Sequence, residues 1–209
     1  MKNSDDRVFK MSPTSHYGRI IDLLRAQDVI SVRDAENVGV SRRLLSKWAS
    51  DGKLRRVAQG LYQSIRSEPD DMAVLVAASS QIAISHESAL YLLGLTGRSP
   101  ARYSATFPKG VNPPRAFSLS LKKYYIVPEL FETGRSEART PNGALVPCYN
   151  AERTICDILR SRSRIDSETL YDALRRYAAS PTKDLNRLSE YAQIFRLEKI
   201  LPIYMGALL

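Results

Sequence analysis

The segment Ser41–Tyr62, SRRLLSKWASDGKLRRVAQGLY, constrains the fold of this chain more than any other part of it. Ser41 is a preferred helix N-cap, because its side-chain oxygen can accept a hydrogen bond from a free backbone N–H of the first turn. Three apolar residues then recur at helical spacing: Leu44, Leu45 and Trp48. Gly52 suits the left-handed position that ends many helices. The runs LRRV and LYQ predict two short strands joined by Ala58-Gln59-Gly60, so the segment reads as a helix followed by a β-hairpin.

This helix and hairpin carry much of the positive charge of the chain. Seven basic residues lie between Arg42 and Arg66, against one acid, Asp51. Residues 1–67 hold 13 Lys and Arg against 7 Asp and Glu, a net of +6, and the remaining residues contribute +3 to the total of +9. Cationic side chains that contact phosphates release the counterions bound there, and this release favours association with a polyanion. The first third of the chain is therefore expected to bind nucleic acid. The candidate DNA-binding residues are Arg42, Arg43, Ser46, Lys47 and Ser50 on the helix and Lys53, Arg55, Arg56 and Gln59 after it.

The residues before this segment predict a helix-turn-helix. A helix opens at Pro13-Thr14 and ends near Gln27, and a second begins at Ser31, where Asp34 supplies the carboxylate of a capping box. Ala35 is small where two helices cross, and Gly39 follows where the turn requires a positive φ. An acid at position 34 departs from the usual motif, which often has an apolar residue there. With the basic hairpin as a wing, the pattern favours a winged helix-turn-helix that binds double-stranded DNA.

The chain is expected to have an α+β fold in two domains. Residues 1–12 are interpreted as a flexible arm, residues 13–66 as the winged helix-turn-helix, and residues 70–209 as a mixed α/β domain that follows a linker ending near Pro69. Alternating residues predict strands at 102–107 and 117–127, and Asn142-Gly143 predicts a type I′ hairpin. Helical stripes predict helices at 151–160, 167–179, 183–196 and around 197–208. The second domain should therefore contain a small, mostly antiparallel sheet and C-terminal helices.

The residues that carry chemistry favour a binding protein over an enzyme. The two histidines, His16 and His86, each lie at the start of a predicted helix, and Ser85 is interpreted as a helix cap rather than a nucleophile. Cys148 and Cys156 lack the spacing of a zinc site and are expected to be free, buried thiols. The run 152–157, ERTICD, predicts ion pairing along a helix. We therefore expect no catalytic residues, no metal and no cofactor, and, without an apolar signal or membrane segment, a cytoplasmic protein.

Three stretches of the sequence are distinctive: DGKLRRVAQGLY at the wing, ISHESALYLLGL, and PCYNAERTICDILR with the helical residues after it. Together they resemble the AbiEi antitoxins of type IV toxin–antitoxin, or abortive-infection, systems, and the resemblance extends over residues 14–208. It implies a repressor that binds inverted repeats in the promoter of its own operon. It also implies neutralisation of a nucleotidyltransferase-like toxin, functionally and not necessarily through a stable contact. Seven residues of this sequence carry the implied DNA contact: Arg42, Arg43, Ser46, Lys47, Arg55, Arg56 and Gln59.

Two other classes of protein stay open at this point. One is a transcriptional regulator without a toxin partner that responds to a ligand in its second domain. The other is a metal-dependent nuclease that the winged helix directs to DNA, in which Glu152 would be an essential acid.

Overall fold

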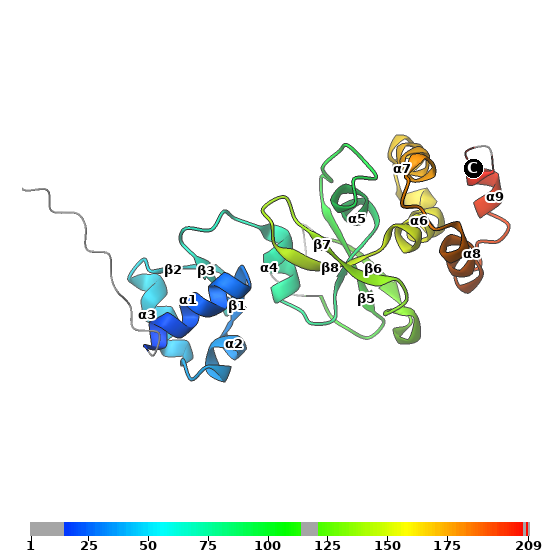
Figure 1. Cartoon of the computed structure of the whole chain (residues 1–209). Helices are drawn as coiled ribbons and strands as arrows, with labels where there is room; N and C mark the ends of the chain where they lie inside the picture. The colour runs from blue at the N-terminus through cyan, green and yellow to red at the C-terminus, as the bar shows by residue number, and fades with distance from the viewer. Residues whose placement is uncertain (1–14, 114–120, 207, 209) are drawn as a thin grey trace, which may run out of the picture. The chain divides into compact units, whose positions relative to one another are not determined.

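A computed structural model describes residues 15–113, 121–206 and 208, and the arm expected at residues 1–12 lies outside them. The chain divides into two compact units between Glu68 and Pro69 (Figure 1). No helix within the described ranges is long and apolar enough to cross a membrane.

The N-terminal unit has the element order of a winged helix-turn-helix. The described part of this unit contains three helices and three strands, in this order: α1 (His16–Ala26), β1 (Val29–Ser31), α2 (Val32–Asn37), α3 (Arg42–Ser50), β2 (Leu54–Ala58) and β3 (Leu61–Ser64). The strands pair antiparallel in the order β1-β3-β2. The predicted helix, turn, helix and hairpin are confirmed.

The predicted local signals for α2 and α3 are present in the structure. Ser31 and Asp34 form the capping box, because each side chain accepts a hydrogen bond from the backbone N–H of the other residue. Ser41 caps α3 by accepting from the backbone N–H of Leu44. Gly39 and Gly52 both have positive φ, of 77° and 68°, at the turn before α3 and at its end. These residues fix where α3 begins and ends.

Two features of this unit differ from the sequence expectation. Strand β1 was not predicted, because three residues are too short to show an alternating pattern; it forms by pairing with β3, where Ile30 lies opposite Tyr62. The hairpin turn is shorter than expected, since Ala58 belongs to β2 and only Gln59-Gly60 connect the strands. A bulge between Arg56 and Ala58 shifts the register there.

The C-terminal unit combines a five-stranded sheet with helices. In chain order, the elements of this unit up to its last strand are α4 (Asp71–Ala77), β4 (Ala83–Ile84), α5 (His86–Leu92), β5 (Tyr103–Pro108), β6 (Leu121–Ile126), η2 (Pro128–Leu130), β7 (Arg135–Arg139) and β8 (Leu145–Tyr149). The helical segments that follow are α6 (Ala151–Arg160), η3 (Arg162–Arg164), α7 (Ser167–Ala179), α8 (Leu185–Ile194) and α9 (Leu201–Met205). Figure 1 shows α6 to α9 gathered at one end of the sheet. The α+β fold class is confirmed.

The sheet is mixed rather than mostly antiparallel. In the strand order β6-β5-β4-β8-β7, the pairs β4–β5 and β7–β8 are antiparallel, whereas β4–β8 and β5–β6 are parallel. Turn signals in a sequence identify hairpins, and parallel partners are joined by long connections that leave no such signal. Of the strand expected at 117–127, residues 117–120 lie outside the described residues and the rest contains β6.

The β7–β8 hairpin has a five-residue connection, residues 140–144, in place of the predicted type I′ turn. A type I′ turn needs positive φ at both central residues, and in this loop only Gly143 has one, of 91°. Pro141 fixes its own φ near −65° and therefore favours a type I turn before the glycine. Thr140 and Ala144 close the loop through a backbone hydrogen bond of 2.8 Å.

Candidate nucleic-acid interface

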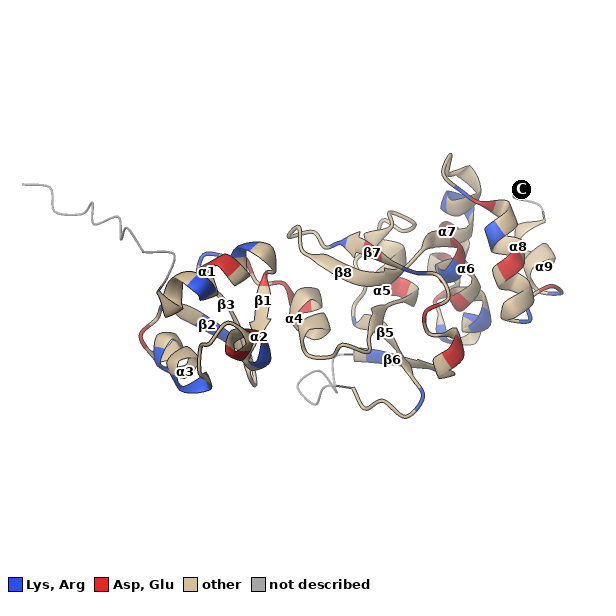
Figure 2. Cartoon of the chain, turned by 60° about the horizontal axis from the view of Figure 1, so that its bottom comes forward, with Lys and Arg blue, Asp and Glu red and all other residues tan. Residues whose placement is uncertain are grey.

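Helix α3 is divided into a buried face and a basic exposed face. Leu45 and Trp48 pack in the core with Ile20, Val40 and Tyr62. The other side of the helix carries five of the predicted DNA-binding residues, all of them exposed: Arg42, Arg43, Ser46, Lys47 and Ser50. Figure 2 shows basic residues along α3. The hydrophobic contacts thus fix the helix and leave the basic side chains at the surface.

The cations of α3 are free to bind an anion. Within the part of the chain that the structure describes, Arg42, Arg43 and Lys47 form no ion pair, whereas Arg25 on α1 pairs with Asp22 at 2.8 Å. An arginine offers five N–H donors in a fixed fork, which suits both phosphate oxygens and the acceptor edge of guanine. The two hydroxyls of the set are already engaged: Ser50 donates to the carbonyl of Lys47, and Ser46 contacts Tyr62.

Arg19 holds the turn before α3 and was not among the predicted residues. Its Nη1 donates to the carbonyl oxygen of Val38 at 2.6 Å, which joins α1 to the helix-turn-helix turn. A Cβ at Gly39 would lie 3.1 Å from the same nitrogen. One arginine in an amphipathic helix resembles any other solvated cation, so no pattern in the sequence identifies this contact.

The two arginines of the wing point to opposite faces of its sheet. Arg56 lies opposite the buried Tyr62 in the β2–β3 register, on the face that α3 covers, and is itself exposed. Arg55 lies opposite Gln63 and donates to the carbonyl oxygens of Ser67 and Ile65 at 3.2 and 3.4 Å. Arg56 is therefore placed beside the basic face of α3, and Arg55 ties β2 to the segment that follows β3.

Two further predicted residues lie at the ends of the wing. Gln59 is exposed in the two-residue turn at its tip. Lys53, which is also exposed, lies with Nζ 5.8 Å from the ring centre of Tyr17, and its carbonyl accepts from the Tyr17 hydroxyl. Tyr17 in turn packs edge-on against Trp48, with ring centres 5.1 Å apart. Lys53 thus lies next to the Tyr17–Trp48 contact, which packs α3 against α1.

The ERTICD segment forms a buried structural network in the C-terminal unit. Arg153 is fully buried and donates from Nε to Asp157 at 3.0 Å, as the sequence predicted, and its Nη1 donates to the carbonyls of Leu130 and Thr133. Burial raises the pKa of Asp157, although the Arg153 guanidinium opposes that shift.

Glu152 accepts from the Tyr177 hydroxyl and from a backbone N–H. In the described residues, no group of three or more His, Cys, Asp or Glu could hold a metal ion.

His86 has a more specific environment than a helix cap. Its ring stacks on Tyr124 with centroids 3.3 Å apart, while Nδ1 lies 3.0 Å from Ser85 Oγ and Nε2 lies 3.1 Å from Ser161 Oγ. Ser85 occupies the N-cap position but makes no side-chain capping bond, because its hydroxyl faces His86 and Thr106. The prediction that the Ser85 side chain caps α5 is therefore wrong, although Ser85 does occupy the N-cap position. Burial, and then the nearby cations, lower the pKa of His86 well below 6.5.

Cys148 and Cys156 are both buried and free, as expected. Burial raises the pKa of each thiol to about 12.

The N-terminal unit is thus a winged helix-turn-helix in which α3 has a basic, exposed face. Residues 19–65 match the family described as transcriptional regulator, AbiEi antitoxin. The match includes the wing stretch and supports the resemblance there; the C-terminal stretches lie outside the matched residues.

Most of the chain has a fold that is already known from a crystal structure. The structure of the RV2827C protein from Mycobacterium tuberculosis aligns with a TM-score of 0.58 over 85% of this chain and 71% of that chain, at 15% sequence identity. At that identity the likeness shows a shared fold alone. A comparison with curated proteins found no match.

Proposed function

We propose that this chain is a DNA-binding antitoxin that represses its own toxin–antitoxin operon through the N-terminal winged helix. The observation that carries the proposal is the exposed face of α3, where Arg42, Arg43 and Lys47 have no ion pair within the described residues and Arg56 lies on the adjoining face of the wing. A regulator family match over residues 19–65 supports the same conclusion.

In the proposed complex α3 enters the major groove, which is about 12 Å wide and admits a helix. Arg42 or Arg43 would donate to the O6 and N7 acceptors of guanine, the commonest specific contact of arginine with DNA. Lys47, Lys53 and Arg56 would bind phosphates and set the register of the protein on the duplex. Gln59 at the wing tip is within the part of the fold that can approach the minor groove.

One winged helix contacts only a few base pairs, so repressors of this class bind repeated half-sites as pairs. Inverted repeats in the promoter would match a two-fold arrangement of two copies. Because an autorepressor acts on chromosomal DNA, the proposal implies a cytoplasmic protein.

The antitoxin part of the proposal concerns a nucleotidyltransferase-like toxin and the C-terminal unit. It rests on the regulator family, whose description includes antitoxin activity. Neutralisation need not involve a stable complex, since an antitoxin can also act by opposing the effect of the toxin.

Two measurements test the two parts separately. Gel shifts with the DNA upstream of the gene should show binding that a scrambled duplex of equal length does not compete away. Co-expression with the neighbouring toxin gene under a separate inducible promoter should restore growth. Binding to both duplexes with equal affinity would refute the repressor, and continued growth arrest with both proteins expressed would refute the antitoxin.

A further inference from the structure

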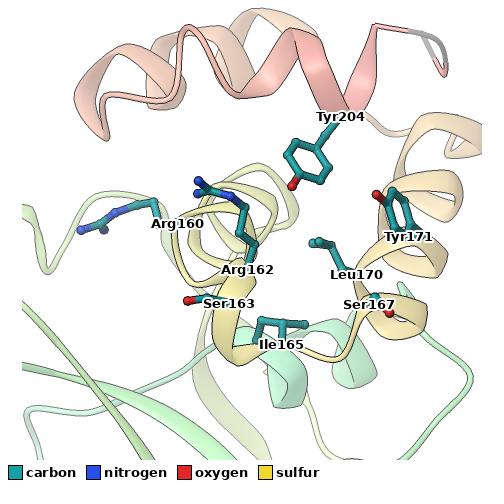
Figure 3. Close-up of a pocket in the computed structure, with 8 residues that line it drawn as sticks. All are labelled: Arg160, Arg162, Ser163, Ile165, Ser167, Leu170, Tyr171 and Tyr204. Atoms are coloured by element: carbon teal, nitrogen blue, oxygen red, sulfur yellow. The ribbon is translucent and has the colours of Figure 1, made fainter.

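A cavity of about 480 Å³ opens among the C-terminal helices, between η3, α7 and α9 (Figure 3). Its volume lies within the range of about 300–1,000 Å³ that is usual for small-molecule sites. The residues that line it are Arg160, Arg162, Ser163, Ile165, Ser167, Leu170, Tyr171 and Tyr204. All of them come from the C-terminal unit, and none serves the proposed DNA interface.

One end of the cavity is positively charged and lacks a counter-charge. No carboxylate is among the lining residues. Arg162 donates one hydrogen bond, to the carbonyl of Leu159, and forms no ion pair with any described residue. Arg160 lies 3.8 Å from Asp157, but that carboxylate already accepts from Arg153 at 3.0 Å. The hydroxyl of Ser163, which follows Arg162 in η3, adds a donor at this end, so this part of the cavity suits a phosphate group.

A second cavity of the same unit shows what a neutralised arginine cluster looks like. It measures about 290 Å³, and three arginines line it. There Arg98 pairs with Glu168 at 2.6 Å, and Arg175 and Arg176 both lie within 4 Å of Asp172, which is itself part of the lining. Those arginines have carboxylate partners, whereas Arg162 has none among the described residues, so the larger cavity is the better candidate for binding an external anion.

The other end of the larger cavity is aromatic. The rings of Tyr171 and Tyr204 have centroids 6.2 Å apart with planes inclined by 31°. Tyr171 is 50% exposed, and the buried side chains of Ile165 and Leu170 form the floor. Figure 3 shows Arg162 reaching up beside Tyr204, with Tyr171 on the opposite side of the cavity and Leu170 below the two tyrosines. Exposed, closely spaced aromatic faces offer a stacking surface for a planar ring.

We propose that this cavity binds a mononucleotide, with the phosphate at Arg162 and the base against Tyr171. Arg162 and Tyr171 lie on opposite sides of the cavity (Figure 3), which matches a ligand that has a phosphate at one end and a planar heterocycle at the other. Such a site would give the C-terminal unit a small-molecule input that is independent of DNA binding by α3.

The test is isothermal titration of the full chain with adenosine 5′-monophosphate, inorganic phosphate and adenosine. The nucleotide should bind at one site per chain, and phosphate or adenosine alone should bind roughly tenfold more weakly or worse, because each reaches only one end of the cavity. Phosphate that binds as tightly as the nucleotide would overturn the mononucleotide assignment. No heat signal with the nucleotide at about 1 mM would overturn the site itself.

Matched variants locate the binding. Arg162→Gln should weaken nucleotide binding roughly tenfold or more through loss of a charge-assisted bond, and Tyr171→Ala should weaken it through loss of stacking. Arg139→Gln is the control, since Arg139 is also exposed and also donates to a nearby carbonyl, that of Gly143. Arg43→Gln is a second control, which should leave nucleotide affinity unchanged unless the nucleotide binds at α3 instead of in the cavity. Equal losses in Arg162→Gln and in either control would refute the assignment to this cavity.

Discussion

The hydroxyl oxygens of Ser46 and Tyr62 lie 3.3 Å apart and connect the exposed helix α3 to the central strand of the wing. Tyr62 is 1% exposed, and it pairs with Ile30 on one side and with Arg56 on the other. The contact therefore joins the helix, the wing and β1 at one point. It sets the distance between the basic face of α3 and the basic face of the hairpin.

This contact should have a measurable coupling energy. Tyr62→Phe keeps the ring in the core and removes only the hydroxyl, so the free energy of unfolding should fall by about 0.5–1.5 kcal/mol. Ser46→Ala should cost less, and the double variant should cost less than the sum, as urea denaturation of all four proteins would show. Tyr17→Phe is the control, because its hydroxyl donates to an exposed carbonyl. Strict additivity of Tyr62→Phe and Ser46→Ala would argue against the contact.

Arg43 and Arg56 should affect DNA binding in different ways. Arg56→Ala should weaken binding to specific and scrambled duplexes alike and reduce the salt slope by about 1, because a phosphate contact releases counterions. Arg43→Ala should instead reduce discrimination between the two duplexes by about 1–3 kcal/mol if it binds a base edge. Gel shifts over a range of salt concentrations measure both quantities. Arg25→Ala, which removes an exposed and ion-paired arginine of α1, should change neither. Equal losses on both duplexes for Arg43→Ala would reject base reading.

Arg55 should behave as a structural residue, although it is adjacent to Arg56. Its guanidinium already donates to the carbonyls of Ser67 and Ile65, so Arg55→Gln should lower the free energy of unfolding by about 1 kcal/mol. The salt slope of DNA binding should stay the same in fluorescence anisotropy titrations. A slope that decreases by about 1, as expected for Arg56→Ala, would mean that Arg55 also contacts phosphate.

The comparison of Arg55 with Arg56 shows where sequence reasoning stops. Both were predicted to contact DNA, although successive residues of a strand point to opposite faces and only one of the two can lie beside α3. Which one does depends on the register between β2 and β3, and on the bulge between Arg56 and Ala58. The register depends on long-range packing around Tyr62, so it cannot be predicted from the strand propensities of the individual residues.

Local chemistry, by contrast, predicted the boundaries of α2 and α3 well, whereas the last helix, expected around 197–208, spans only Leu201–Met205. The caps at Ser31 and Ser41 and the positive φ at Gly39 and Gly52 each depend on residues within one turn of chain. Strand β1, the parallel strand pairs and the Arg19 contact depend on partners far along the chain. The basic face of α3 was predictable because apolar periodicity alone decides which side of a helix is buried.

The turn between α2 and α3 should be sensitive to a single added methyl group. Gly39→Ala places a Cβ at positive φ, 3.1 Å from the Arg19 nitrogen, and should lower the free energy of unfolding by more than about 1 kcal/mol. Gly52→Ala is the matched control, because φ is also positive there and nothing lies within 4 Å of the added Cβ. Thermal denaturation of both variants measures the difference. Equal destabilisation would mean that Arg19 moves aside without cost.

Burial of His86 should make the chain less stable in mild acid. Its folded-state pKa is well below 6.5, so below that pH the unfolded chain binds a proton that the folded chain does not. The contribution of His86 to stability is therefore fully present above about pH 6.5 and is lost as the pH falls, with a slope of up to about 1.4 kcal/mol per pH unit. Urea denaturation at a series of pH values from about 5 to 8 measures that slope.

The variant that isolates this effect is His86→Asn. Position 86 has a φ of 48°, and asparagine tolerates that conformation better than most residues. The substitution should lower stability at every pH, through loss of the Ser161 contact and of stacking on Tyr124, and should also flatten the slope between about pH 5 and 6.5. His16→Asn leaves His86 as the one histidine of the chain and should keep the slope. If the slope in His86→Asn stayed the same, the acid sensitivity would belong to carboxylates elsewhere in the protein.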